Sequence, residues 1–233
     1  MFLCLVLFVL TVRVRGLFTV AEAQENNLAH LDPPNTVDFP SIQAFLGVRD
    51  QEGDFVYGLT SRDISVLEDE NTIPVMELDH LKPGAQIVFV INPGPSFAIR
   101  DSNGFSRYDY IVQHLQGWAE SRVGTTTDDL SLLGTEGIEV THLDSIEEWL
   151  SSLLAFQPDA RNAVPDYDVL SRGLEVAADP APRPGMGRSV VFITSLPPDA
   201  ASIGLQNIVS RANQGNVQID VWLVASPERF SSR

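Results

Sequence analysis

The pattern of hydrophobic and polar positions changes character near residue 84. Before that point, short segments that alternate apolar and polar side chains are separated by turn residues, which is typical of short antiparallel strands. The strand candidates are residues 41–48, 54–57, 64–68 and 73–78. Because Pro83-Gly84 breaks the pattern, we predict a small β module over residues 37–83.

After residue 84, strand patterns alternate with helix patterns. The runs at residues 86–91 and 189–194, which are apolar except at their ends, are typical of strands buried on both faces of a parallel sheet. The other expected strands are 130–133, 138–142 and 217–224, and the expected helices are 108–121, 145–156, 166–178 and 200–213. This order predicts an α/β fold, with a doubly wound, mostly parallel sheet and helices on both faces, preceded by the small all-β module.

Four side chains in or next to the expected helices have predicted roles. Asp144 is placed to cap the helix that follows it, and Asp166 to cap the helix at 166–178, because an acidic side chain satisfies free N–H groups at a helix N-terminus. Trp118 and Trp149 lie on apolar helix stripes. Their position predicts packing in the core.

The N-terminus carries an export pattern. Residues 1–12 are almost wholly apolar, and Ala21-Glu22-Ala23 supplies the small-x-small pattern that precedes a cleavage point. Such a run is too short to cross a bilayer, because about 20 apolar residues are needed. We expect residues 1–23 to be a signal peptide or an N-terminal anchor of an exported protein, located extracellularly, at the cell surface or in the periplasm. Arg13 and Arg15 follow the apolar run, an order that a misplaced start codon or an uncleaved anchor explains equally well.

The segment after the expected cleavage point, residues 24–36, is polar, carries Pro33-Pro34 and shows no periodicity. We expect it to be a linker without fixed structure. The only cysteine, Cys4, would leave with the signal peptide, so the mature chain would hold no disulfide and no cysteine metal site. A cysteine-free exported domain is typical of a bacterial surface or periplasmic protein.

The charge of the chain excludes one class of partner. The sequence has 31 acidic and 15 basic residues, and its net charge of −16 repels phosphate backbones. We therefore expect no nucleic-acid partner. The acidic surface attracts cations or basic partners, or it keeps an exported protein soluble.

The ends of the two most apolar strands are the expected place for a site, because ligands of open α/β sheets bind at the carboxyl ends of the strands. These strands end at Asn92 and Ser195. The loop Asn92-Pro93-Gly94-Pro95-Ser96 has neither a Gly-x-Gly-x-x-Gly turn nor a phosphate loop, and its prolines lack the N–H groups that would bind a phosphate. Ser96 also lacks the Gly-x-Ser-x-Gly surroundings of a hydrolase nucleophile.

The histidines do not indicate a metal or catalytic centre. They are His30, His80, His114 and His142, and no two have the paired spacing of metal ligands. We expect each to lie on the surface or on a helix face. Since no acid, base and nucleophile cluster in the sequence, we expect no enzyme activity, no cofactor and no direct small-molecule substrate.

Around the Asn92 loop, over residues 86–225, the chain resembles the von Willebrand factor type A domain, and the β module resembles the small strand module often found ahead of such domains in bacterial surface proteins. In that family the first strand ends in Asp-x-Ser-x-Ser, and a threonine of a mid-domain loop and an aspartate after the fourth strand complete a metal-ion-dependent adhesion site. The corresponding positions in this chain are Asn92, Gly94, Ser96, Pro165 and Ser195. Of the usual residues, only the second serine, Ser96, is retained.

The resemblance implies a degenerate adhesion site that holds no metal. Mg²⁺ is a hard cation that prefers carboxylate and hydroxyl ligands, and both carboxylate positions are lost. We therefore predict no tight binding of Mg²⁺ or Ca²⁺. Asp101, Asp166 and Asp199 are the nearby acids that would have to replace the lost ligands.

We expect a non-catalytic, metal-independent protein-binding or adhesion-type module, whose unknown protein partner meets the loops around residues 92–96, Pro165 and residues 195–199. The alternative is a structural scaffold or assembly subunit with no ligand at these loops. Type A domains normally add a further helix and strand after the last strand seen here, so the domain over residues 84–233 is expected to be C-terminally incomplete. Membrane contact is expected only through the N-terminal segment or a missing C-terminal part.

Overall fold

The computed structural model describes residues 28–31, 34–51, 56–124, 127–183, 185–196 and 204–224. They form two compact units. The larger unit holds the described residues of 84–182 and those from 186 onward, and the smaller unit holds those up to residue 83 together with 183 and 185. The expected signal peptide or anchor, Cys4 and Asp199 lie outside the described residues.

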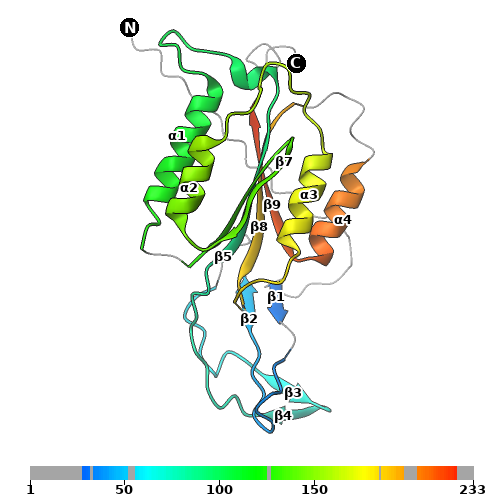
Figure 1. The fold of residues 1–233 in the computed structure, drawn as a ribbon. Coiled ribbons are helices and arrows are strands. Elements are labelled where there is room, and N and C mark those ends of the chain that lie inside the picture. Colours follow the sequence, from blue (N-terminus) through cyan, green and yellow to red (C-terminus); the bar gives the residue numbers. More distant parts are fainter. Residues whose placement is uncertain are drawn as a thin grey trace. The chain divides into compact units, whose positions relative to one another are not determined.

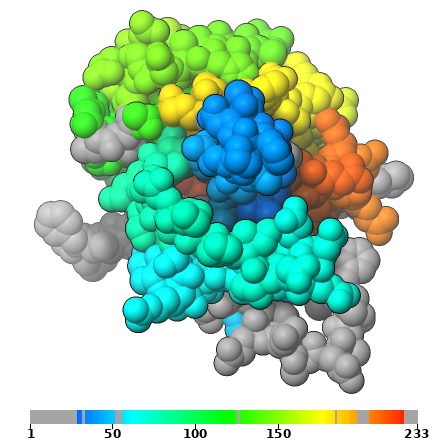
Figure 2. All heavy atoms as spheres, turned by 90° about the horizontal axis from the view of Figure 1, so that it is seen from below, coloured from blue at the N-terminus to red at the C-terminus, as the bar shows by residue number. Residues whose placement is uncertain are grey.

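The smaller unit contains two short antiparallel sheets, drawn in blue to cyan in Figure 1, and Figure 2 shows the atoms of this segment in the same colours. Its strands are β1 (Leu28–Leu31), which pairs with β2 (Leu46–Arg49), and β3 (Val66–Glu68), which pairs with β4 (Asn71–Ile73). Of the expected strands, 41–48 and 64–68 overlap β2 and β3, whereas 73–78 is a strand only at Ile73. The unit has few buried side chains, so most of this segment lacks the burial that stabilises longer strands.

Strand β1 corrects the expectation of an unstructured linker at residues 24–36. It pairs with β2 in antiparallel register, and a bridge between Asn35 and Gln43 continues the contact. Strand β1 has 4 residues, too few to show a hydrophobic period. It is therefore defined by its pairing partner and not by its own pattern.

The larger unit is built on one five-stranded sheet with the order β7-β6-β5-β8-β9 (Figure 1). Its strands are β5 (Ala85–Asn92), β6 (Asp129–Gly134), β7 (Gly137–Leu143), β8 (Gly187–Ser195) and β9 (Val217–Val224). Only β7, at one edge, runs antiparallel to its neighbour. Residues 86–92 of the central strand are all buried, as the apolar run predicts.

Helices cover both faces of this sheet. Helices α1 (Arg107–Glu120) and α2 (Ile146–Ala155) lie on one face, and α3 (Asp168–Ala177) and α4 (Leu205–Gln214) on the other (Figure 1). Trp149 of α2 is fully buried against Phe89 of β5 and Trp118 of α1, and Trp118 is partly buried, so both tryptophans pack in the core as expected. The doubly wound α/β fold that the sequence predicts is confirmed.

The helix starts include one correction. Helix α2 is capped by Ser145, whose Oγ accepts the N–H of Glu148 at 3.1 Å, and not by Asp144. Ser145 is the last residue with an extended backbone, so Asp144 lies one position too far from the free N–H groups. Asp166 does accept the N–H of Asp168 at 3.2 Å, although α3 begins two residues later than predicted.

Among the described residues, no helix has the length and apolar content needed to cross a membrane.

Candidate functional site

The five positions predicted from the sequence come together at the carboxyl ends of the parallel strands. Because β5 and β8 are parallel neighbours, their ends meet, and Asn92 lies in register with Thr194. The chain then enters a short 3-10 helix, η1 (Pro95–Ala98), while the loop before α3 reaches the same edge of the sheet. The five positions are Asn92, Gly94, Ser96, Pro165 and Ser195.

The Asn92 side chain ties three segments together. It is fully buried, and its Nδ2 donates to the carbonyl oxygen of Asp166 and to Thr194 Oγ1, each at 2.9 Å. Its Oδ1 accepts the N–H of Asp166 at 3.1 Å. Both ends of the amide are therefore satisfied, and an ionised carboxylate at this position could make only the accepting contact.

The Ser96 hydroxyl extends this network to the edge strand β9. Its Oγ lies 2.6 Å from the carbonyl oxygen of Val224 and 2.7 Å from Ser195 Oγ. A hydroxyl has one proton and a carbonyl oxygen only accepts, so Ser96 donates to Val224 and Ser195 donates to Ser96. Thr194 in turn donates to the carbonyl oxygen of Ser195 at 2.7 Å. All the hydroxyl protons of this closed network are engaged within the protein.

Gly94 is required at its position by space and not by backbone conformation. Its φ of −162° is extended, a value that any residue adopts. A Cβ atom there would lie 2.6 Å from Pro165 Cγ and 2.8 Å from Ser195 Oγ. The loop after β5 therefore packs tightly against both the loop before α3 and the end of β8.

Two of the three acids that would have to replace the lost metal ligands, Asp101 and Asp166, are engaged elsewhere. Asp101 holds the turn before α1: a 2.6 Å hydrogen bond from the Tyr110 hydroxyl lowers the pKa of Asp101, and the N–H groups of Asn103 and Phe105 add to this effect. Asp166 accepts from the backbone at the start of α3. Across the described part of the chain, no group of three or more His, Cys, Asp or Glu side chains is arranged to hold a metal ion.

Calorimetric titration of the purified chain with Mg²⁺ or Ca²⁺ is therefore expected to show no binding tighter than about 1 mM. The reason is that Asn92, Ser96 and Ser195 use their polar atoms within the closed network. Micromolar affinity that disappears in Asn92→Ala would contradict this expectation.

Exposed apolar side chains flank the segments of the closed network along the chain, and we refer to them as the apolar rim. It consists of four large side chains that are 40–69% exposed: Ile99, Phe105, Val164 and Leu196. Val164 and Leu196 are chain neighbours of Pro165 and Ser195, and Ile99 and Phe105 belong to the connection between η1 and α1. Four of the five predicted positions are buried, so the side chains that a partner can touch are other residues of these loops and of the connection before α1, which the sequence does not indicate.

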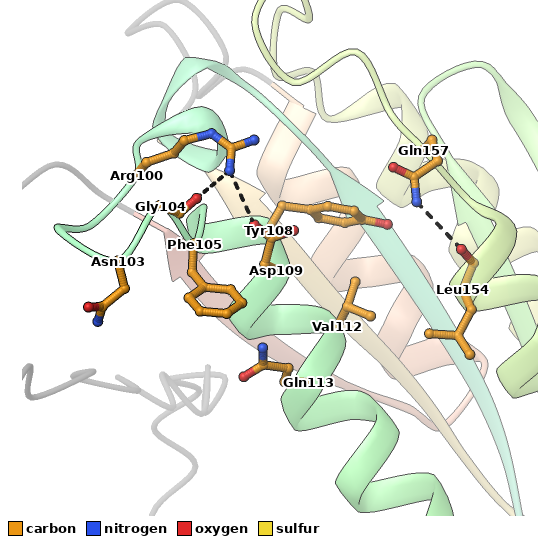
Figure 3. A pocket seen from close by; sticks show the side chains of 10 residues that line it. All are labelled: Arg100, Asn103, Gly104, Phe105, Tyr108, Asp109, Val112, Gln113, Leu154 and Gln157. Atoms are coloured by element: carbon orange, nitrogen blue, oxygen red, sulfur yellow. Dashed lines mark hydrogen bonds and ion pairs between the residues drawn. The ribbon is translucent and has the colours of Figure 1, made fainter.

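A groove of about 420 Å³ opens beside the rim, at the start of α1 (Figure 3). Its walls include Phe105, Tyr108, Val112 and Leu154. The Arg100 guanidinium donates to the carbonyl oxygen of Gly104 and lies 3.7 Å from Asp109 Oδ2 (Figure 3). Burial raises the pKa of Tyr108, whose hydroxyl donates to the carbonyl oxygen of Phe156 at 2.8 Å. The groove thus continues the rim with mixed apolar and polar walls.

One of the surface histidines makes contacts that the sequence does not predict. All four histidines are exposed, as expected, and the imidazole of His142 lies between the carboxylates of Asp129 and Asp179. These partners are 13 and 37 positions away along the chain, so no local motif could have indicated the cluster. It lies at the opposite end of the parallel strands from the rim, because Asp129 begins β6.

No protein-family model and no curated protein matches the chain. Among solved structures, the chain is similar to the conserved hypothetical protein BatB from Bacteroides thetaiotaomicron, with 13% identity over 59% of this chain and 65% of that chain and a TM-score of 0.42. It is also similar to an uncharacterized protein from Bacillus cereus ATCC 10987, with 13% identity over 68% of this chain and 59% of that chain and a TM-score of 0.21. The chain covers less than two-thirds of the length of either structure.

Proposed function

We propose that this chain is a non-catalytic, metal-independent protein-binding module of the von Willebrand factor type A kind, and that its partner contacts the apolar rim. The observation that carries the proposal is the rim itself, whose four exposed apolar side chains lie next to a closed hydrogen-bond network. Grouped apolar side chains with a polar surround are typical of protein-contact surfaces.

The closed network gives the rim a stiff base. Asn92, Ser96 and Ser195 connect the ends of β5, β8 and β9, and Gly94 packs directly on Pro165. A surface that is already ordered loses less conformational entropy when a partner binds. This arrangement therefore supports a binding role at loops that bring no carboxylate ligand.

The same contacts favour a role without catalysis. Ser96 and Ser195 are the two serines among the five predicted positions, and each donates its proton to another protein oxygen. A serine nucleophile needs a base that accepts its proton. Among the described residues, neither hydroxyl has a histidine or carboxylate partner, which supports a binding module over an enzyme.

The proposal includes the kind of partner and the location of the module. A net charge of −16 disfavours nucleic acid, so we propose a protein partner. The apolar run at residues 1–12 and the Ala21-Glu22-Ala23 pattern support export from the cell that makes the protein.

The test is capture of the partner by rim variants of the full chain. Val164→Glu and Leu196→Glu place a charge on the rim without touching the network, and Val123→Glu is a matched control, since Val123 is 46% exposed after α1, at the far end of the sheet. Tagged proteins are purified from the source cells after cross-linking, and co-purified proteins are quantified by mass spectrometry. We expect both rim variants to capture the partner at least about tenfold less well than Val123→Glu, because burying a charge costs more than 1.4 kcal/mol.

Two outcomes would overturn the proposal. Capture that is equal in all variants would favour the alternative role, a structural scaffold with no ligand at these loops. Capture that is lost on chelation of divalent cations would contradict metal independence. Circular dichroism of each variant verifies that the fold is retained.

A further inference from the structure

The cluster around His142 joins three parts of the larger unit. Nδ1 of the imidazole lies 2.8 Å from Asp129 Oδ2, and Nε2 lies 3.1 Å from Asp179 Oδ2. His142 belongs to the edge strand β7, Asp129 begins β6, and Asp179 follows the last residues of α3. The imidazole therefore connects the edge strand both to its neighbour and to the end of a helix.

The backbone of His142 has an unusual conformation that fits this role. Its φ of +55° is in the left-handed region, which residues other than glycine rarely adopt. Its N–H donates to Ser131 Oγ at 3.1 Å instead of continuing a regular ladder, and the β6–β7 register shifts in this part of the pair. A non-glycine residue keeps such a conformation only where its contacts stabilise it.

The two carboxylates beside the imidazole differ in how far they are exposed to solvent. The side chain of Asp129 is 3% exposed, whereas that of Asp179 is 56% exposed. Arg188 of β8 donates to the carbonyl oxygen of Asp179, and Arg122 pairs with Asp128 at 2.6 Å. Other charged residues of the adjoining elements make no hydrogen bond or ion pair with the imidazole within the described chain: Glu139 of β7, Asp144 and Glu147 at the start of α2, and Asp168, Arg172 and Glu175 of α3.

The number of protons on the imidazole decides how many carboxylates it can hold. A protonated imidazole donates from both nitrogens, whereas a neutral imidazole donates from one and presents a lone pair at the other. A buried carboxylate without a partner costs far more free energy than an exposed one. A neutral His142 therefore keeps its proton on Nδ1 for Asp129, and its Nε2 lone pair repels Asp179.

We propose that His142 is a proton-operated link between the edge strand β7 and the end of α3: the protonated imidazole holds Asp129 and Asp179 together, and loss of its proton releases Asp179. The backbone of Asp179 also accepts from Gln86 Nε2 at 3.5 Å and from Arg188 at 3.2 Å. These contacts bind the main chain and not the carboxylate. Release of the carboxylate therefore loosens the end of α3 without unfolding the domain.

The pH range of the link follows from the surroundings of the imidazole. Burial by itself would lower the pKa of His142, but the hydrogen bonds and charges of Asp129 and Asp179 outweigh burial and raise the pKa above the ordinary value of 6.5. A raised folded-state pKa means that the stabilisation is fully present below pH 6.5 and is lost as the pH rises through the folded-state pKa. The link is therefore closed in mildly acidic solution and opens toward alkaline pH.

The test is an NMR titration of the full chain that follows the His142 ring protons and the exchange of the Ala178 and Asp179 amides. These amides donate to carbonyl groups of the last turn of α3, so they report on its end. We expect a His142 midpoint above pH 6.5 and at least about a threefold loss of amide protection, corrected for intrinsic exchange, across that midpoint. In Asp179→Asn we expect the midpoint to fall and the pH-dependent change in protection to disappear.

His114→Gln is the matched control, because His114 is exposed on α1 and makes no contact with the cluster. It is expected to leave both readouts as in the wild type. A His142 midpoint at or below pH 6.5, or protection in the wild type that does not change across the midpoint, would overturn the proposal. So would an unchanged response in Asp179→Asn.

Discussion

Replacing Asn92 with Asp is expected to lower the free energy of unfolding by about 3–5 kcal/mol at pH 7, the cost of a buried charge without a partner. The carboxylate would face the carbonyl oxygen of Asp166 at 2.9 Å, where Asn92 now donates a hydrogen bond. It would also lose the contact that Asn92 donates to Thr194. Chemical denaturation followed by circular dichroism measures the effect.

The pH dependence of this variant has a definite sign. Burial and the facing carbonyl oxygen would raise the folded-state pKa of the new aspartate above its unfolded value. The loss of stability is therefore small at pH values below the unfolded pKa, where the carboxyl is protonated in both states, and it grows as the pH rises toward the folded-state pKa. Asn213→Asp is a control for the same chemical change on an exposed side chain of α4.

A loss below about 1 kcal/mol in Asn92→Asp would show that Asn92 does not hold the strand ends together. Stabilisation of the variant by millimolar Mg²⁺ would show instead that one restored carboxylate is enough to rebuild a metal site. The first result would remove the physical basis for a rim supported by the closed network, whereas the second would agree with the lost carboxylates as the reason that the native site holds no metal.

The elements that the sequence predicts well are those whose own residues carry the signal. The runs at 86–91 and 189–194 are apolar except at their ends because both faces of β5 and β8 are covered by helices, so burial is visible in the sequence itself. Strand β1 has no such signal, because it has 4 residues and is exposed where its burial is described. Its existence depends on β2, which lies more than ten residues further along the chain.

In the candidate site, too, the sequence predicts some features and not others. Strand order predicts that Asn92 and Ser195 meet, because the carboxyl ends of parallel neighbours lie at one edge. It does not predict that Asn92 bonds to Asp166, 74 positions away, or that Ser96 bonds to Val224, 128 positions away. Such contacts depend on the packing of whole elements. The sequence therefore indicates where the site lies, but not that its polar groups bond to one another in a closed network.

Replacing Trp149 with Ala is expected to lower the free energy of unfolding by about 3–5 kcal/mol. The indole is fully buried, and its ring centroid lies 4.6 Å from that of Phe89 on the central strand and 5.7 Å from that of Trp118 on α1. Its Nε1 donates to the carbonyl oxygen of Ser131 at 3.4 Å. Truncation therefore leaves a cavity where α1, α2 and the sheet meet, and denaturant unfolding measures the cost.

Trp222→Ala is the control that shows whether the cost of truncating a tryptophan follows its burial. Trp222 contacts the same core from β9 but is only partly buried, so its truncation removes less contact area and opens less of a cavity. We expect its cost to be about half that of Trp149→Ala or less. Equal costs would contradict the expectation that the cost of truncation follows the burial of the indole.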